Sequence, residues 1–331
     1  MKFVVLVFVF TMLAVGCTTS EKTQRPLGVR EISIDVRSDT HIIDPITGEH
    51  LDWSAVLDRI KDVEIILLGE QHDHVVGHAV QLAIVEDVFD RYPKSVLALE
   101  MLERDEQLLV DDYMEDIINA KKLAALTQST NWGGDGGWEA WYQPIIDAVK
   151  DRGGSVVAAN APRRYVKFGR TSTVGYDRVD ELPDDRRIFV DYPKELSSGR
   201  YRQRFWDLFA HGEEESDQEP VDVMTEVDPD DPKLATFKSQ QIWDATMAQS
   251  IANTDPTLDR KTILLAGQFH VEYDGGIVQE LRQRLPKARV LVISIHREAP
   301  DNEWEGAPVI ADILIMGDIE VEYVDVEDSQ E

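Results

Sequence analysis

Two short segments of the chain place a glycine and then a histidine directly after an apolar run. Residues 67–72 read Leu-Leu-Gly-Glu-Gln-His, and residues 264–270 read Leu-Leu-Ala-Gly-Gln-Phe-His. A glutamate and an imidazole could share a divalent metal ion or act as general acid and base. Because the carboxyl ends of parallel strands lie at one edge of a sheet, we expect Glu70, His72 and His270 to meet in one cleft.

Two further polar groups follow apolar runs. Glu100 comes directly after residues 96–99, where a carboxylate either caps a helix or belongs to the site. Arg163 lies in the segment Asn-Ala-Pro-Arg-Arg at residues 160–164. A guanidinium there could bind a carboxylate of a ligand, or hold a site glutamate by a bidentate pair. We therefore count Arg163 as a candidate site residue and leave both interpretations of Glu100 open.

Residues 132–144 combine glycines with the large aromatic side chains Trp132, Trp138, Trp141 and Tyr142. Aromatic walls bury a planar apolar ligand well, so this stretch could contact such a ligand. The same tryptophans could instead be core residues of an amphipathic helix that begins near Trp138. The glycine-rich run does not have the spacing of a dinucleotide-binding loop.

The residues after His72 predict a helix. Asp73 is expected to cap it. His74 and His78 lie four residues apart and share one face of this helix, which could turn toward the site. We favour the interpretation that this face is solvated.

From residue 63 onward, apolar runs alternate with helical patterns. Strands are predicted at 64–69, 96–99, 155–159, 262–266 and 290–295, with an edge strand at 313–316, and helices at 74–91, 104–128, 138–151, 234–253 and 274–285. This order predicts an α/β fold in which a mainly parallel β-sheet is covered by helices on both faces, with a helical subdomain.

The expected domain occupies residues 40–300 and contains an acidic irregular insertion at about 171–233. Residues 213–231 are dominated by Asp and Glu, and such a run is usually solvated. Calcium binding is the alternative, but the spacing of an EF-hand loop with its glycine is absent. Residues 301–331 are expected to form a C-terminal extension with an acidic tail.

The net charge excludes one class of partner. The chain has 34 basic and 63 acidic side chains, for a net charge of −29. Nucleic-acid binding requires basic patches, so no nucleic-acid partner is expected. The sequence also lacks the Gly-x-Ser-x-Gly, Walker A and His-Glu-x-x-His motifs.

The N-terminus has the pattern of a bacterial lipoprotein signal peptide. Residues 3–15 carry no charge, and the run is too short to span a bilayer. It ends in small residues before Cys17, the only cysteine in the chain. We expect residues 1–16 to be removed, Cys17 to be lipidated and residues 17–39 to act as a polar tether. Thr18, in place of the Asp usual in inner-membrane lipoproteins, favours the outer membrane, with the domain facing the periplasm.

Six ordered segments resemble those of the ChaN-like family of haem-binding, iron-regulated lipoproteins, within a wider superfamily that includes erythromycin esterases and the TIKI and TraB proteins. They read Leu-Leu-Gly-Glu-Gln-His-Asp at 67–73, Ala-Leu-Glu-Met at 98–101, Trp-Tyr-Gln-Pro at 141–144, Ala-Asn-Ala-Pro-Arg at 159–163, Ile-Trp-Asp-Ala-Thr-Met-Ala at 242–248 and Ala-Gly-Gln-Phe-His at 266–270. The resemblance runs from about residue 40 to residue 296. Residues 213–231 look unlike the family.

The resemblance implies haem binding for iron acquisition, with a tyrosine ligand to the iron and haems stacked between two protomers. Tyr142 lies in one of the matching segments and is the expected axial ligand, while Tyr113 and Tyr165 are lesser candidates. A phenolate suits ferric haem. Trp138, Trp141, Arg163, His72 and His270 are the other expected haem contacts, with Arg163 toward a propionate.

Two functions therefore stand as hypotheses. The preferred one is a non-enzymatic haem-binding lipoprotein, with a haem-linked homodimer and a haem receptor as further partners. The alternative is a hydrolase of peptidase or esterase type that uses Glu70, His72, Glu100 and His270. In that case Glu70, His72 and His270 would be metal ligands or acid/base groups.

Overall fold

The computed structural model describes residues 34–127, 132, 137–170, 176–208, 231–300 and 309–318. Cys17, the expected signal peptide, most of the tether and nearly all of the acidic run lie outside these residues. In the described part of the chain, no helix is long and apolar enough to cross a membrane.

The sheet has eight strands in the described residues, in the order β2-β1-β8-β7-β3-β6-β4-β5. These strands are β1 (His41–Ile43), β2 (His50–Leu51), β3 (Ile65–Glu70), β4 (Val96–Glu103), β5 (Ser155–Asn160), β6 (Thr262–Gly267), β7 (Val290–His296) and β8 (Ile313–Met316). All pairs from β8 to β5 are parallel, and β1 pairs antiparallel with both β8 and β2. The predicted mainly parallel sheet is thus confirmed.

The predicted edge position of residues 313–316 is wrong. These residues form β8, which lies between β7 and β1 inside the sheet. The cause is the N-terminal segment, because β1 returns to the sheet and pairs with the free side of β8. The three residues of β1 are too few to be recognised by alternation, so the sequence pattern did not indicate this partner.

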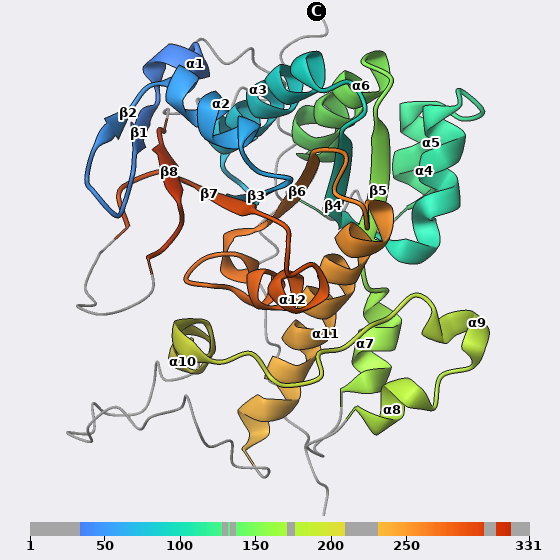
Figure 1. The fold of residues 1–331 in the computed structure, drawn as a ribbon. Helices are drawn as coiled ribbons and strands as arrows, with labels where there is room; N and C mark the ends of the chain where they lie inside the picture. Colours follow the sequence, from blue (N-terminus) through green and yellow to red (C-terminus); the bar gives the residue numbers. More distant parts are fainter. Residues whose placement is uncertain are drawn as a thin grey trace, which may run out of the picture.

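Helices cover both faces of the sheet (Figure 1). One face packs against α1 (Val36–Asp39), α2 (Trp53–Lys61), α3 (Val75–Arg91), α4 (Gln107–Met114), α5 (Ala120–Leu126) and α6 (Gln143–Asp151). The other packs against α11 (Pro232–Thr254) and α12 (Gly276–Arg284). Alternate residues of each strand point to opposite faces. In β3, for example, Leu68 belongs to the first core and Leu67 to the second.

The remaining helices are short. They are α7 (Arg163–Gly169), α8 (Asp177–Asp180), α9 (Asp184–Arg187) and α10 (Gly199–Asp207). In Figure 1, α7, α8 and α9 form a group beside α11, and a small apolar cluster that includes Val166 and Ile242 joins them to α11. This group brings α7 next to the carboxyl ends of the central strands.

We predict that core packing on the central strands dominates the stability of the fold. Leu265 of β6 is fully buried, and its replacement by alanine should lower the free energy of unfolding by about 2–5 kcal/mol. The same change at Leu108, which is 71% exposed, should change it by no more than about 0.5 kcal/mol. Urea unfolding of both variants checks this. Equal losses of unfolding free energy in the two variants would show that Leu265 of β6 stabilises the fold no more than an exposed leucine does.

Candidate functional site

Glu70 is the last residue of β3, and its side chain is buried. Its carboxylate is held by three groups from different elements. The ring Nδ1 of His72 lies 2.7 Å from Oε1, the hydroxyl of Tyr142 donates to Oε1 at 2.6 Å, and Nε2 of Gln81 on α3 donates to Oε2 at 2.6 Å. A buried carboxylate needs such partners, because an unpaired buried charge is very costly.

These contacts keep Glu70 ionised. Burial raises the pKa of Glu70. The hydrogen bond with His72 and the charge of the neighbouring imidazoles lower this pKa by more than burial raises it, so the net pKa is below its ordinary value. Burial lowers the pKa of His72, but the hydrogen bond and charge of Glu70 raise it more, so the net pKa of His72 is raised.

The ring of His72 borders a cavity. The side chain of His72 is 41% exposed. Its Nε2 lies near the backbone of Gly267, where an added Cβ would come within 3.2 Å of this nitrogen. The ring of Trp132 packs edge-on against His72, with the ring centroids 4.9 Å apart. Thus Nδ1 of His72 contacts Glu70, while Nε2 lies beside the backbone of Gly267.

A second carboxylate and histidine lie at the adjacent strand ends. Oε2 of Glu100 accepts the backbone N–H of Gly267 at 2.6 Å, and Oε1 lies 3.4 Å from Nε2 of His270. The other ring nitrogen of His270, Nδ1, lies 2.6 Å from Oδ1 of Asp244 on α11. His270 is therefore placed between two carboxylates, and the structure makes Glu100 a site residue rather than a helix cap.

The pKa values of this pair move in opposite directions. Burial raises the pKa of Glu100, but the charge of His270 and the hydrogen bond with it lower the pKa to about 2. Burial lowers the pKa of His270, but the charges of Glu100 and Asp244 raise it to about 10. At neutral pH, His270 is therefore an imidazolium beside the ionised carboxylate of Glu100.

Sequence reasoning missed Asp244 and Tyr201. Asp244 is fully buried, and Tyr201 of α10 donates its hydroxyl hydrogen bond to Oδ2 of Asp244. The available signal was a lone carboxylate within the apolar stretch of residues 242–248. A buried acid on a helix requires a partner, but the sequence did not identify His270 as that partner.

A cavity of about 420 Å³ joins these groups. Its lining includes both His72 and His270, together with Glu100. Apolar walls come from Trp132, Val166, Phe205 and Trp243, and basic side chains come from Arg163, Lys167 and Arg170 of α7 and its end. The cavity lies where ligands bind in open α/β sheets, beyond the carboxyl ends of the strands.

The basic side chains are available for an anionic ligand. The guanidinium of Arg163 lies over the ring of Trp132, 5.1 Å from its centroid, and Arg170 donates to the hydroxyl of Thr236. Among the residues that the structure describes, Arg163, Lys167 and Arg170 form no ion pair. Three cations on one wall favour a ligand that carries more than one negative charge.

The predicted aromatic contacts lie behind the site instead of in the cavity. Trp138, Trp141 and Tyr142 are all buried, on a short π-helical turn directly before α6. Trp141 stacks on the ring of His78, with the centroids 4.7 Å apart. Burial and the charge of Glu70 raise the pKa of Tyr142 well above its ordinary value. The Tyr142 hydroxyl is therefore a neutral donor to Glu70.

The other two tyrosine candidates also lie elsewhere. The hydroxyl of Tyr113 donates to Asp147, and burial raises its pKa further. The ring of Tyr165 packs against the guanidinium of Arg164, 4.5 Å from its centroid. In the described residues, no tyrosine lines the cavity that contains His72 and His270.

The prediction that His74 and His78 lie on a solvated helix face is wrong. His74 and His78 are buried, because Nε2 of His74 meets the carbonyl of Gly317 at 2.7 Å and Nδ1 of His78 meets Oε1 of Gln81 at 2.9 Å. Asp73 does not cap the helix either. His74 occupies the N-cap position without a capping hydrogen bond from its side chain, and Asp73 pairs with Arg297 at 3.0 Å.

The three expected metal ligands are not arranged as a metal site. In the residues described above, no group of three or more His, Cys, Asp or Glu side chains is placed to hold a metal ion. Glu70 is occupied by three hydrogen-bonding partners, and both ring nitrogens of His270 contact carboxylates. The site therefore consists of two histidine–carboxylate pairs.

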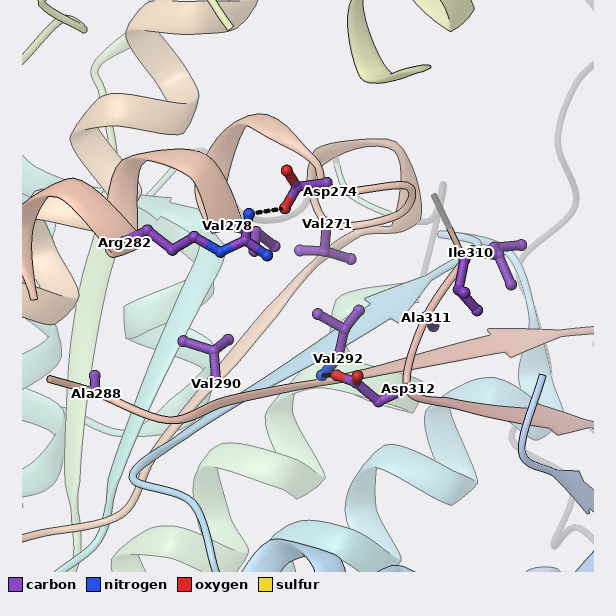
Figure 2. A pocket seen from close by; sticks show the side chains of 11 residues that line it. Val271, Asp274, Val278, Arg282, Ala288, Val290, Val292, Ile310, Ala311 and Asp312 are labelled. Atoms are coloured by element: carbon purple, nitrogen blue, oxygen red, sulfur yellow. Dashed lines mark hydrogen bonds and ion pairs between the residues drawn. The ribbon is translucent and has the colours of Figure 1, made fainter. Parts of the chain in front are cut away.

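A separate cavity of about 410 Å³ lies between α12 and β7 (Figure 2). Val290 and Val292 form one wall and Val278 the other, and Arg282 pairs with Asp274 at 2.6 Å near its rim. None of the site residues predicted from the sequence lines this cavity.

The fold and the site define an α/β protein with a ligand cavity beyond the strand ends. The family described as "Haem-binding uptake, Tiki superfamily, ChaN" matches residues 56–281, which is more than half of the chain. The chain belongs to this family.

The fold agrees with that of one solved structure. The structure described as cofacial haem binding to ChaN of Campylobacter jejuni has a TM-score of 0.57 at 18% identity, and the match covers 84% of this chain and 96% of that one. A mutant of the erythromycin esterase EreC, in its open conformation, has a TM-score of 0.41 at 13% identity, with 83% and 81% covered. Among curated protein sequences, none matches this chain.

We predict that the Glu100–His270 pair makes stability depend on pH at both ends. Glu100, with a pKa lowered from 4.5 to about 2, stabilises the folded chain above pH 4.5, and this contribution is lost as the pH falls toward 2. His270, with a pKa raised from 6.5 to about 10, stabilises it fully below pH 6.5, and this is lost as the pH rises through 10.

Urea unfolding across this pH range should therefore show the greatest stability between pH 4.5 and pH 6.5. In the Glu100→Gln variant, the loss on the acid side should shrink by a few kcal/mol, at about 1.4 kcal/mol per pKa unit. Glu139→Gln, at an exposed position, is the matched control and should leave the profile unchanged. An unaltered acid limb in Glu100→Gln would contradict the pairing.

Proposed function

We propose that the chain is a haem-binding lipoprotein that holds haem at the bacterial cell envelope during haem and iron acquisition. The observation that carries this proposal is the cavity at the strand ends, which combines apolar walls with a wall of three cations. Membership of a family of haem-binding uptake proteins supports it.

The chemistry of the cavity fits haem. Haem is a flat apolar ring with two carboxylates at one edge. Trp132, Phe205 and Trp243 provide aromatic surface for a planar ring. Arg163 and Lys167 provide cations for the propionates, and an arginine can hold a carboxylate by two parallel hydrogen bonds. Iron, when bound, would supply the Lewis acid that a histidine or tyrosine of the protein ligates.

The oligomeric part of the proposal comes from the family. The Campylobacter jejuni protein is described as binding haem cofacially. We extend this to a haem-linked homodimer in which two haems stack between protomers. A haem receptor in the envelope is the further partner that uptake requires.

Haem binding is tested by titrating the purified full-length chain in detergent with hemin and following the Soret band. Lys167→Glu should weaken binding by about tenfold or more, equivalent to about 1.4 kcal/mol, because it removes one cation from the propionate wall and adds a charge of the wrong sign. Lys121→Glu, at an exposed position on α5, is the matched control and should bind as the wild type does. Sizing with and without hemin tests the dimer.

Weak absorbance that never saturates in the wild type would contradict haem binding. Equal affinities of the wild type, Lys167→Glu and Lys121→Glu would show that haem binds elsewhere on the chain.

A hydrolase is the second candidate, because two histidine–carboxylate pairs meet at one cavity. His72 with Glu70 behind it has the arrangement of a general base oriented by an acid. In this case, the wild type would hydrolyse an ester or peptide substrate, and His72→Ala would abolish the activity. A broad ester and peptide screen without turnover would count against this candidate.

We propose that Cys17 carries the membrane anchor. Stable anchoring takes more than one acyl chain, and the bacterial lipoprotein modification supplies several. Cys17→Ser should therefore move the protein from the outer-membrane fraction to the soluble fraction, as seen by cell fractionation and immunoblotting. Ser20→Ala should leave it in the membrane. Membrane retention of the Cys17→Ser variant would exclude this anchor.

A further inference from the structure

We propose that the cavity between α12 and β7 is a second binding site, and that its ligand is a small organic cation, an ammonium group on an apolar body (Figure 2). Its volume of about 410 Å³ lies in the lower part of the range of small-molecule sites, about 300–1,000 Å³. It shares no lining residue with the cavity at the strand ends, so this inference is independent of the function proposed above.

The cavity exists because β8 begins later along the sheet than β7 does. The pairing of the two strands starts at Ile293 and Ile313. Val290 and Val292 of β7 therefore precede the paired part, and their side chains belong to the core beneath α12. Val278 of α12 lies across the cavity from them. The space between helix and sheet is thus walled mainly by aliphatic side chains.

Asp312 brings a carboxylate into this apolar space. Its Oδ2 accepts the backbone N–H of Val292 at 2.7 Å, whereas its Oδ1 accepts no hydrogen bond from the part of the chain that the structure describes. The side chain is half-buried. Burial raises the pKa of Asp312 by more than the hydrogen bond from Val292 and the charge of Arg59 lower it, so its net pKa is raised. The ionised form therefore lacks a compensating partner.

The two arginines near Asp312 are engaged with other carboxylates. Arg59 donates to the backbone carbonyl of Asp312 at 3.0 Å, but its guanidinium pairs with Asp44 at 2.6 Å. Arg282, at the rim of the cavity, pairs with Asp274 at 2.6 Å. Each arginine has its own carboxylate, so the cavity has one carboxylate in excess. A cationic group of a ligand would supply the missing partner by a charge-assisted hydrogen bond.

The rest of the lining favours an organic cation over a metal ion. Calcium and magnesium take about six or more oxygen ligands. The neighbours of Asp312 in the lining include Val271, Ile310 and Ala311, which offer no side-chain oxygen. In the described residues, no group of acidic side chains, histidines or cysteines is placed to hold a metal. Aliphatic walls instead suit the hydrocarbon part of a ligand.

The test is isothermal titration calorimetry of the purified full-length chain in detergent, with 2-phenylethylammonium as the probe and the titration into detergent alone subtracted. The wild type should bind this probe about tenfold or more tightly than 2-phenylethanol, which has the same body and no charge, because a hydrogen bond to a charged group is the stronger one. The anion 3-phenylpropionate should bind more weakly than either.

Two variants locate the probe. Asp312→Asn removes the charge while its amide oxygen can still accept the N–H of Val292, so it should weaken binding of the ammonium about tenfold or more and leave binding of the alcohol unchanged. Ala288→Phe adds a ring at a half-buried lining position and should weaken binding of both compounds. Asp58→Asn, at an exposed position on α2, is the matched control and should bind as the wild type does.

Urea midpoints show that each variant is folded, and either variant alone can decide the location of the site. Loss of the ammonium in a variant that keeps the wild-type midpoint supports the site. Equal affinities of the wild type for the ammonium and the alcohol would overturn the assignment of a cation. Wild-type affinity for the ammonium in Asp312→Asn would show that it binds elsewhere. The absence of any heat of binding in the wild type would overturn the site for this class of ligand.

Discussion

The charge of Glu70 at the buried end of β3 constrains the elements around it. A carboxylate in that position is stable only if several donors reach it, and the donors come from the loop after β3, from α3 and from the aromatic turn before α6. These three elements must therefore keep a fixed distance from one strand end. The stacking of Trp141 on His78 fills the space between α3 and the aromatic turn.

The charges at the other strand ends have a different arrangement. Glu100 and Asp244 enclose His270, so the cavity floor holds a charge network that is satisfied internally. The basic residues of α7 instead face the cavity. In a chain with a net charge of −29, this group of cations creates a local attraction for anions at the cavity.

The sequence predicted the parts of this structure that depend on local pattern. Apolar runs closed by glycine indicated the central strands, and strand polarity brought the His72 and His270 loops to one edge. Contacts that depend on the third dimension were not predictable. Asp244 lies in a helix far along the chain from Glu100, and nothing local indicates that both meet His270. Tyr142 lies in an aromatic stretch whose composition is the same for a ligand wall and for a core, and only packing shows that its hydroxyl points inward to Glu70.

The two Gly-x-x-His segments look like equivalent halves of a pair, but Gly267 gives them unequal roles. Its backbone N–H binds Glu100, and its missing side chain leaves room for the imidazole of His72, which comes from the other segment. The second glycine thus leaves space for the first histidine, while the second histidine lies between the carboxylates of Glu100 and Asp244. A side chain at position 267 would therefore press against the ring of His72 and fill the space beside it.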